Sequence, residues 1–353
     1  MVGPTPDVRS IDPGAVAVFE VRPGLWNVRI PLVWPGISHV NAIVLGGAGD
    51  GVTLVDCGTA GDPTCWDALV SGLERTGHGI EDVTDLVVTH AHSDHFGLAA
   101  RVVVASGCTM WMHPAHEAFT DGALEPERIY AARERRARAE GVPADVLDQY
   151  ADTGEETDFA LVPLPPFREL RGGMEVPSGL GPWEVLETPG HSPSHLCLYQ
   201  PQERLLILGD LVSRVFAPWY DYGYTADPVA ELAASLDLVA GLDVELALPG
   251  HGRPIEDLAE IIEMHREEIV RRLNLVEVEV AREPGPAYEI GLRAFGPAPS
   301  GMAEVGRLQE AMACLRHLRL QGRVTREELP SGLFRYAPTG GRLVEDGACV
   351  HDR

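Results

Sequence analysis

Short apolar runs, each closed by a polar or glycine-containing turn, recur along the chain up to about residue 253. Runs of this length that are rich in β-branched residues predict buried strands. They span Val16–Leu32, Val40–Gly46, Val52–Asp56, Asp85–Thr89, Trp183–His191, Leu205–Asp210 and Val244–Gly252. One helix is predicted through Trp66–Arg75, after the third run. This order of strands and helices predicts an α/β fold, an αββα sandwich.

The pattern changes after residue 253, where apolar positions recur every three or four residues, as on one face of a long helix. These positions follow Pro254 and are Leu258, Ile261, Ile262, Ile269, Leu273, Val276 and Val280. Two further helices and two short strands are predicted at Pro286–Phe295, Met302–Leu320, Arg323–Thr325 and Leu333–Ala337. We therefore predict two domains, residues 1–253 and 254–353.

A charged segment interrupts the strand pattern between about residues 115 and 168. It contains EPERIYAARERRARAEG, in which Ile129, Ala132 and Arg136 give only a weak apolar face. A helix of this kind is either a solvated surface helix or part of a lid over a site. We expect the insertion to be a helical lid.

Four residues with metal-binding side chains lie within six positions, directly after the predicted strand Asp85–Thr89. The segment THAHSDH holds His90, His92, Asp94 and His95. Imidazole and carboxylate together suit zinc, or a mixed iron and zinc site, better than calcium or magnesium. The pattern predicts a metal site on the loop that leaves this strand.

Three later strands each end in a turn that carries one more residue of this type. The segments WEVLETPGH, LLILGD and VELALPGHG add His191, Asp210 and His251. Five histidines and two aspartates are too many for one tetrahedral ion, but they suit two ions that share a bridging carboxylate and a bridging water. The chain is therefore predicted to bind two divalent metal ions, zinc first, with iron or manganese as alternatives.

These ordered motifs resemble those of the metallo-β-lactamase superfamily. THAHSDH fits its THxHxDH motif, and ETPGHS, LGD and LPGHG fit the later motifs, over roughly Val16–Arg253. The resemblance implies the ligand sets His90, His92 and His191 for one metal and Asp94, His95 and His251 for the second, with Asp210 as the bridge. TLVDCG fits the first motif of the family, in which Asp56 supports a ligand rather than binding metal; the alternative is a plain turn residue.

The residue types at the ligand positions narrow the choice among the branches of the superfamily. Flavin-linked di-iron reductases of this fold carry glutamate at the second ligand position, where this chain has histidine. Many β-lactamases carry cysteine where Asp210 stands, so the chain resembles the glyoxalase II, lactonase and ribonuclease branches more closely. Persulfide dioxygenases, which use one iron, share the histidine motif and remain a minor alternative.

The predicted chemistry follows from two ions held together. They lower the pKa of a bound water, so that hydroxide forms near neutral pH and acts as the nucleophile. One metal would polarise the substrate oxygen. Asp94, the predicted catalytic residue, would orient the hydroxide and pass a proton to the leaving group. A lysine nucleophile is excluded, because all 28 basic residues are arginine.

Three histidines and one serine near the motifs are weaker candidates. His195 would contact substrate or support a ligand through a hydrogen bond, or would simply begin the next strand. His113 and His116 are assigned to the lid or to the surface. Ser194 stands where the family often has glycine, a change that would slightly alter the turn beside the metals.

Aromatic residues gather after Asp210 in the segment FAPWYDYGY. Trp219, Tyr220, Tyr222 and Tyr224 are candidates for a substrate-binding wall, because they follow a ligand in a loop. A packed loop or a dimer contact is the alternative.

The composition is that of an ordinary enzyme, with 353 residues and 45% apolar residues. There is no uninterrupted apolar stretch of about 18 residues and no leader-like start, so we expect a cytoplasmic protein that does not enter a membrane. The six cysteines lack paired spacing, which favours reduced thiols.

Three helices and a hairpin after residue 253 resemble a winged-helix domain, as found behind the catalytic domain in one branch of the superfamily. That branch includes an endoribonuclease acting on single-stranded RNA and relatives that act as thioesterases. From Gly285 onward there are nine arginines and eight acidic residues, and the whole chain has a net charge of −25. A net charge of −25 repels a phosphate backbone, and a C-terminal region that is nearly neutral does not attract one. The charges therefore favour a scaffold or homodimer role for this region over nucleic-acid binding.

Two function classes remain. The leading one is a hydrolase of a small-molecule or carrier-bound acyl ester, a thioester (acyl-CoA or acyl-carrier) or a lactone, with a β-lactam far behind. The alternative is an endoribonuclease that uses the same hydroxide on the phosphodiesters of single-stranded RNA.

Overall fold

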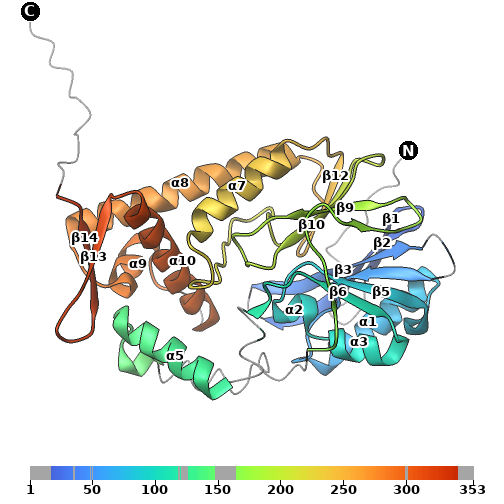
Figure 1. The fold of residues 1–353 in the computed structure, drawn as a ribbon, viewed down its shortest axis with the longest axis horizontal. Coiled ribbons are helices and arrows are strands. Elements are labelled where there is room, and N and C mark those ends of the chain that lie inside the picture. The colour runs from blue at the N-terminus through green and yellow to red at the C-terminus, as the bar shows by residue number, and fades with distance from the viewer. Residues whose placement is uncertain are drawn as a thin grey trace, which may run out of the picture.

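Two β-sheets stack face to face in the structure, and helices cover the outer face of each (Figure 1). The structure is a computed structural model, which describes residues 17–340 apart from 35, 48, 50, 118–119, 121–125, 148–163 and 299–300. This arrangement confirms the predicted αββα fold class. Between the sheets lies a core in which Trp183, Leu45 and Leu198 are fully buried.

The first sheet has seven strands in chain order. They are β1 (Ala17–Arg22), β2 (Leu25–Trp34), β3 (Ile37–Gly46), β4 (Val52–Val55), β5 (Val83–Val88), β6 (Thr109–Met112) and β7 (Arg168–Glu169). Pairing is antiparallel from β1 to β4 and parallel from β4 to β7. The prediction of one strand over Val16–Leu32 is wrong, because a turn separates β1 from β2 at Gly24, where φ is 81°.

Short helices join the strands of the first sheet. They are α1 (Pro63–Thr76), η2 (Ile80–Asp82), α2 (Ser93–Phe96) and α3 (Ala99–Ser106). Helix α1 begins at Asp62, whose side chain accepts a hydrogen bond from the Thr64 amide, with Pro63 in the first turn. Apolar residues of α1 and α3, among them Leu69 and Val102, pack on the outer face of this sheet.

The second sheet has the order β12-β11-β10-β9-β8. Its strands are β8 (Glu175–Val176), β9 (Trp183–Glu187), β10 (Leu196–Gln200), β11 (Leu205–Gly209) and β12 (Leu246–Pro249). Helices α7 (Pro228–Ala240) and α8 (Leu258–Arg282) cover its outer face. None of the helices in the described part of the chain is long and apolar enough to span a membrane.

The C-terminal unit consists of helices and one hairpin at the end of the sandwich (Figure 1). It comprises the end of α8, α9 (Ala287–Phe295), α10 (Gly301–Leu320), β13 (Val324–Glu328) and β14 (Phe334–Pro338). These bounds lie within a few residues of those expected from the periodicity. One continuous apolar core runs from Leu206 in the second sheet through Ile262 and Val276 of α8 to Leu315 of α10. The winged-helix assignment stays a prediction.

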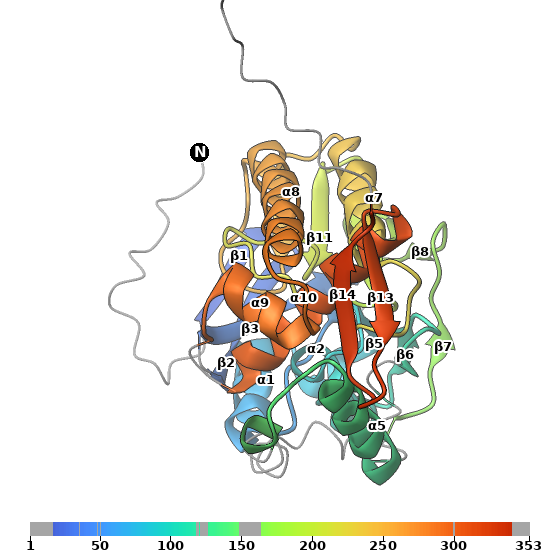
Figure 2. The ribbon, with the colours of Figure 1, turned by 90° about the vertical axis from the view of Figure 1, so that its left-hand side faces the viewer.

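The insertion contributes helix α5 (Pro126–Ala139), which lies against the C-terminal unit below the β13–β14 hairpin (Figure 2). The hydroxyl of Tyr336 donates to a carboxylate oxygen of Glu140 at 3.1 Å, and the amide of Tyr288 donates to the backbone carbonyl of Glu140 at 3.0 Å. The end of α5 is therefore fastened to the C-terminal unit. Much of the rest of the predicted lid lies outside the described residues.

The five cysteines in the described part of the chain are all buried and free, in agreement with the expectation of reduced thiols. Cys349 lies outside the described residues.

Candidate metal centre

The seven predicted ligands converge at one edge of the sandwich, where four strands end. His90, His92, Asp94 and His95 follow β5 and enter the short helix α2, whereas His191, Asp210 and His251 follow β9, β11 and β12. Side chains that could hold metal form three groups: His90, His92 and His191; His90, His95 and Asp210; and Asp94, His95 and His251. The grouping matches the two sets implied by the family resemblance, with Asp210 between them.

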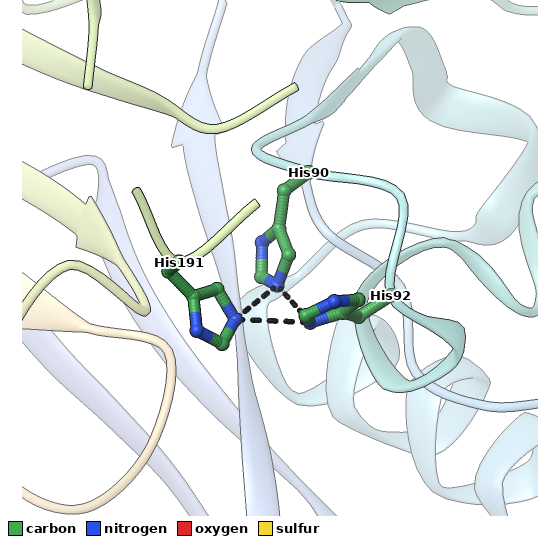
Figure 3. A group of neighbouring side chains, drawn as sticks. All are labelled: His90, His92 and His191. Carbon is green, nitrogen blue, oxygen red and sulfur yellow. Dashed lines mark hydrogen bonds between the residues drawn. The ribbon is translucent and has the colours of Figure 1, made fainter. Parts of the chain in front are cut away.

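Three histidines of the first set point their ring nitrogens at a common point (Figure 3). His90 Nε2 lies 3.0 Å from His92 Nδ1 and 3.3 Å from His191 Nε2, and the last two nitrogens are 2.9 Å apart. Tetrahedral zinc with Zn–N bonds of about 2.0–2.1 Å separates its nitrogen ligands by roughly 3.3 Å. The spacing of the three nitrogens therefore fits one such ion.

The second set brings two histidines to two carboxylates. His251 Nε2 lies 3.1 Å from Asp94 Oδ2 and 3.2 Å from Asp210 Oδ2. His95 Nε2 lies 3.4 Å from Asp210 Oδ1 and 3.6 Å from Asp94 Oδ2. Because Asp210 Oδ2 is also 3.8 Å from His191 Nε2, this carboxylate faces both sets, as a bridging ligand must.

Asp56 supports the ligand loop through three hydrogen bonds. Its carboxylate accepts from the amide and the hydroxyl of Thr89, each at 2.8 Å, and from His95 Nδ1 at 2.8 Å. The Thr89 hydroxyl in turn accepts from His90 Nδ1 at 3.0 Å. These bonds place the ring proton of His90 and His95 on Nδ1, which leaves Nε2 of each free to bind metal.

Two ligands are held by residues that the sequence reading missed. His92 Nε2 lies 3.0 and 3.1 Å from the two oxygens of Asp221, a residue of the aromatic loop, so Nδ1 faces the metal position. His251 Nδ1 donates to the carbonyl of His39 on β3 at 2.7 Å. A carboxylate or carbonyl behind a ligating imidazole fixes its orientation and raises its basicity. Asp221 lies within the aromatic segment already singled out, which is the only sequence signal for it.

His195 and Ser194 act on the ligand loops from behind. His195 Nε2 accepts from the amide of Asp210 at 2.9 Å, and its Nδ1 lies 2.8 Å from the Thr188 hydroxyl. The Ser194 hydroxyl accepts from the amide of Ala91, between two ligands, at 3.1 Å. Both residues therefore hold ligand segments in place, and Ser194 adds a bond that glycine could not make.

Two buried atoms of the centre, His95 Nε2 and Asp210 Oδ1, have no hydrogen-bond partner among the residues that the structure describes. An unpartnered buried polar atom costs free energy, and here both atoms face the other ligand atoms. Neutral imidazole nitrogens with their lone pairs aimed at one another also need a cation between them. The donor set and its unpaired atoms thus fit two divalent ions, on the residues that the sequence predicted.

The charges in the centre set different proton affinities in the two sets. Burial lowers the pKa of His90 well below its usual range and that of His191 to about 4, whereas Asp221 raises the pKa of His92 against the effect of burial. In the second set Asp210 and Asp94 outweigh burial and raise the pKa of His95 well above its usual range and that of His251 to about 10. Protons therefore compete with metal mainly at the second set.

Metal loading at pH 7 is expected to release about two protons with the ion on the second set and at most about one with the ion on the first, because ligating imidazoles must be deprotonated. His95 and His251 carry the protons that leave. Affinity at the second set should rise with pH until about 10, the pKa of His251. Calorimetric titrations of the metal-free protein in buffers of different ionisation enthalpy measure this release. Equal proton release by both ions would contradict the assignment.

The aromatic segment after Asp210 divides between core and surface. Tyr220 is only 2% exposed and packs in the core, so it presents no surface to a substrate, whereas Tyr224 is 41% exposed. Trp219 lies edge-on to His92, with ring centroids 6.4 Å apart, and a Cβ at Gly306 of α10 would lie 3.3 Å from its ring. Trp219 is thus placed beside the first ligand set.

His113 and His116 belong to none of the three metal groups. His113 Nε2 lies 3.4 Å from a carboxylate oxygen of Glu187, and His116 bonds to Thr120 and meets Phe167 edge-on.

The chain belongs to the metallo-β-lactamase superfamily, whose model, described as the metallo-beta-lactamase superfamily, matches residues 35–251. Two solved structures resemble it along nearly their whole length. A metallo-beta-lactamase family protein from Thermus thermophilus has a TM-score of 0.78 at 28% identity, over 90% of this chain and 100% of that one. A beta-lactamase domain protein from Burkholderia ambifaria has a TM-score of 0.79 at 29% identity, over 94% and 97%.

Relatives of known sequence carry hydrolase names. A probable metallo-hydrolase from Bacillus subtilis is 26% identical over 259 residues, 70% of this chain and 78% of that protein. A hydroxyacylglutathione hydrolase from Anaeromyxobacter dehalogenans is 27% identical over 276 residues, 75% and 86% of the two chains. An acyl-coenzyme A thioesterase from Gallus gallus is 32% identical over 94 residues, 26% and 34% of the two chains. The chain is therefore a hydrolase of this superfamily with histidine and aspartate groups suited to divalent metal.

Proposed function

We propose that the chain is a dinuclear metal hydrolase that cleaves an ester-type bond in an acyl substrate, a thioester (acyl-coenzyme A or acyl-carrier) or a lactone. The observation that carries the proposal is the pair of ligand sets that share Asp210. Two relatives, named hydroxyacylglutathione hydrolase and acyl-coenzyme A thioesterase, support a thioester as the substrate. The low charge of the C-terminal unit gives no support to an RNA substrate.

Two ions bound to these sets would polarise the substrate carbonyl and lower the pKa of a water between them. The chain itself supplies the groups that orient and move protons. Asp94 is buried, and His95 and His251 outweigh burial and hold the pKa of its carboxyl below the usual range. An ionised carboxylate at this position can take a proton from the attacking water and deliver it to the leaving oxygen or sulfur.

Hydrogen bonds on the side away from the metal hold the rings of the ligand histidines in a fixed orientation. Asp56 fixes His95, Asp221 fixes His92 and the carbonyl of His39 fixes His251. Each support acts on the nitrogen that does not face the metal, so none competes with substrate. Trp219 lies beside His92 and would contact the acyl or leaving part of a substrate held at the first set.

A substrate panel tests the proposal. The zinc-loaded, iron-loaded and manganese-loaded protein is assayed with acyl-coenzyme A esters, short thioesters, lactones and single-stranded RNA, with the chelated protein as the control. We expect metal-dependent turnover of thioesters or lactones and none of RNA. Metal-dependent RNA cleavage without ester turnover would refute the proposal in favour of a ribonuclease.

A further inference from the structure

Two arginines from distant parts of the chain meet at one tyrosine next to the first ligand set. Arg136 belongs to α5 and Arg316 to α10, and their guanidinium carbons lie 5.7 and 5.8 Å from the centroid of the Tyr222 ring. Tyr222 directly follows Asp221, whose carboxylate holds His92. The insertion, the aromatic loop and the C-terminal unit thus each give one residue to a cluster beside the metal centre, which we call the arginine cluster.

Hydrogen bonds to backbone carbonyl oxygens hold both guanidinium groups in place. Arg136 Nη1 donates to the carbonyl of Tyr222 at 3.0 Å, and Arg316 Nε donates to the carbonyl of Ala226. Gly223 makes room for the first of these, since its φ is +104° and a Cβ there would lie 2.9 Å from Arg136 Nη1. Each of these bonds uses one of the five N–H donors of a guanidinium, so most donors stay available to a ligand.

Neither arginine of the cluster is neutralised by an ion pair with any residue that the structure describes. The charge of Arg136 reaches Glu140 and that of Arg316 reaches Glu231, but neither carboxylate forms an ion pair with them, and Glu140 bonds to the Tyr336 hydroxyl instead. Acidic residues outnumber basic ones by 53 to 28 in this chain. Two arginines that meet one tyrosine ring, and that have no ion pair among the described residues, are therefore suited to a ligand that brings its own negative charge.

We propose that the arginine cluster binds a phosphate group in the leaving half of a phosphorylated thioester such as acyl-coenzyme A. The inference rests on the proposed thioesterase function of the metal centre. Guanidinium forks match the oxygens of a phosphate in a bidentate manner, which an ammonium group cannot do. With the reacting carbonyl at the metals, the flexible arm of the carrier runs past Trp219 and Asp221, and its phosphate reaches Arg136 and Arg316.

Paired substrates isolate the contribution of the phosphate. KM and kcat are measured with an acyl-coenzyme A and with the pantetheine thioester of the same acyl group, which lacks phosphate. Arg136→Ala and Arg316→Ala are each expected to raise KM for the coenzyme A ester roughly tenfold, the usual effect of losing one hydrogen bond to a charged group. KM for the pantetheine ester should not change. Arg133→Ala, on the exposed surface of the same helix, is the matched control.

Binding of free coenzyme A, measured by calorimetry, separates this inference from the proposed function. Weaker binding in both alanine variants, with partial recovery in Arg136→Lys and Arg316→Lys, supports the cluster even if no thioester is hydrolysed. Undiminished binding of free coenzyme A in the variants overturns the cluster. An equal rise of KM for both esters also overturns it, because a general disturbance of the site would act on both. Neither outcome would contradict the proposal that the metal centre hydrolyses thioesters.

Discussion

Replacing Asp94 with asparagine is expected to lower kcat by about 10²- to 10⁴-fold, the range typical of losing a general acid or base. Asparagine keeps the shape of the side chain but removes the charge and the ability to take a proton. Because the Asp94 carboxylate helps to raise the pKa of His251, that pKa should fall in the variant. The measurement is kcat on the best substrate of the panel, together with the metal content of the purified protein.

The first ligand set should keep its metal in Asp94→Asn, since Asp94 is not part of it. Asp67→Asn, an exposed change on α1, serves as the matched control and should behave like the wild type. A variant with two bound ions and kcat within about threefold of wild type would show that Asp94 transfers no proton, because general catalysis contributes far more than that.

Replacing Gly250 with alanine is expected to weaken the second metal by about 10- to 100-fold, the range seen when a group that positions a ligand is lost. A Cβ at this position would lie 2.2 Å from Asp210 Oδ1 and 2.6 Å from His95 Cε1. The bridging carboxylate and one ligand of the second set would both have to move. Overpacking of this kind also costs about 1–3 kcal/mol of folding free energy.

Metal titration and denaturant unfolding of Gly250→Ala test both effects. Gly61→Ala is the matched control, since the nearest atom to its Cβ is the Thr59 hydroxyl at 3.7 Å, an ordinary contact. The expectation fails if Gly250→Ala binds two ions as tightly as the wild type. The first ion should be affected less, because the three atoms nearest to the added Cβ belong to Asp210, His95 and Gly209 and to none of the three histidines of the first set.

The sequence was sufficient to predict the fold class and to bring seven ligand residues together. Each ligand follows an apolar run that ends in a turn, and strands of one sandwich end at a common edge. A second local signal, apolar positions three or four residues apart, explains why helix α8 could be predicted within a few residues. The apolar face of a helix follows from its own sequence, so it can be predicted without knowing which elements pack against it.

The supports behind the ligands could not be predicted in the same way. Asp221 lies 129 residues from His92, and His39 lies 212 residues from His251. The support from His39 is its backbone carbonyl, which every residue possesses, so no residue type marks it. The arginine cluster likewise depends on how α5 and α10 approach one loop, and spacing along the chain does not encode that approach.

The break in the run Val16–Leu32 shows a different limit. Apolar residues continue across Pro23 and Gly24, so the pattern alone indicates one long strand. The turn is decided by Gly24, whose backbone adopts a left-handed conformation that residues with a side chain rarely adopt.

Helix α8 joins the metal-binding and C-terminal parts of the chain through one buried apolar cluster. Its 25 residues extend for about 37 Å, and Ile262 and Val276 belong to the same buried cluster as Leu206 of the second sheet and Leu315 of α10. A chain cut at residue 253 would keep α7 but lose α8, and would expose to water the apolar residues of the second sheet and of α7 that α8 covers. We therefore expect the two parts to unfold together in one cooperative transition.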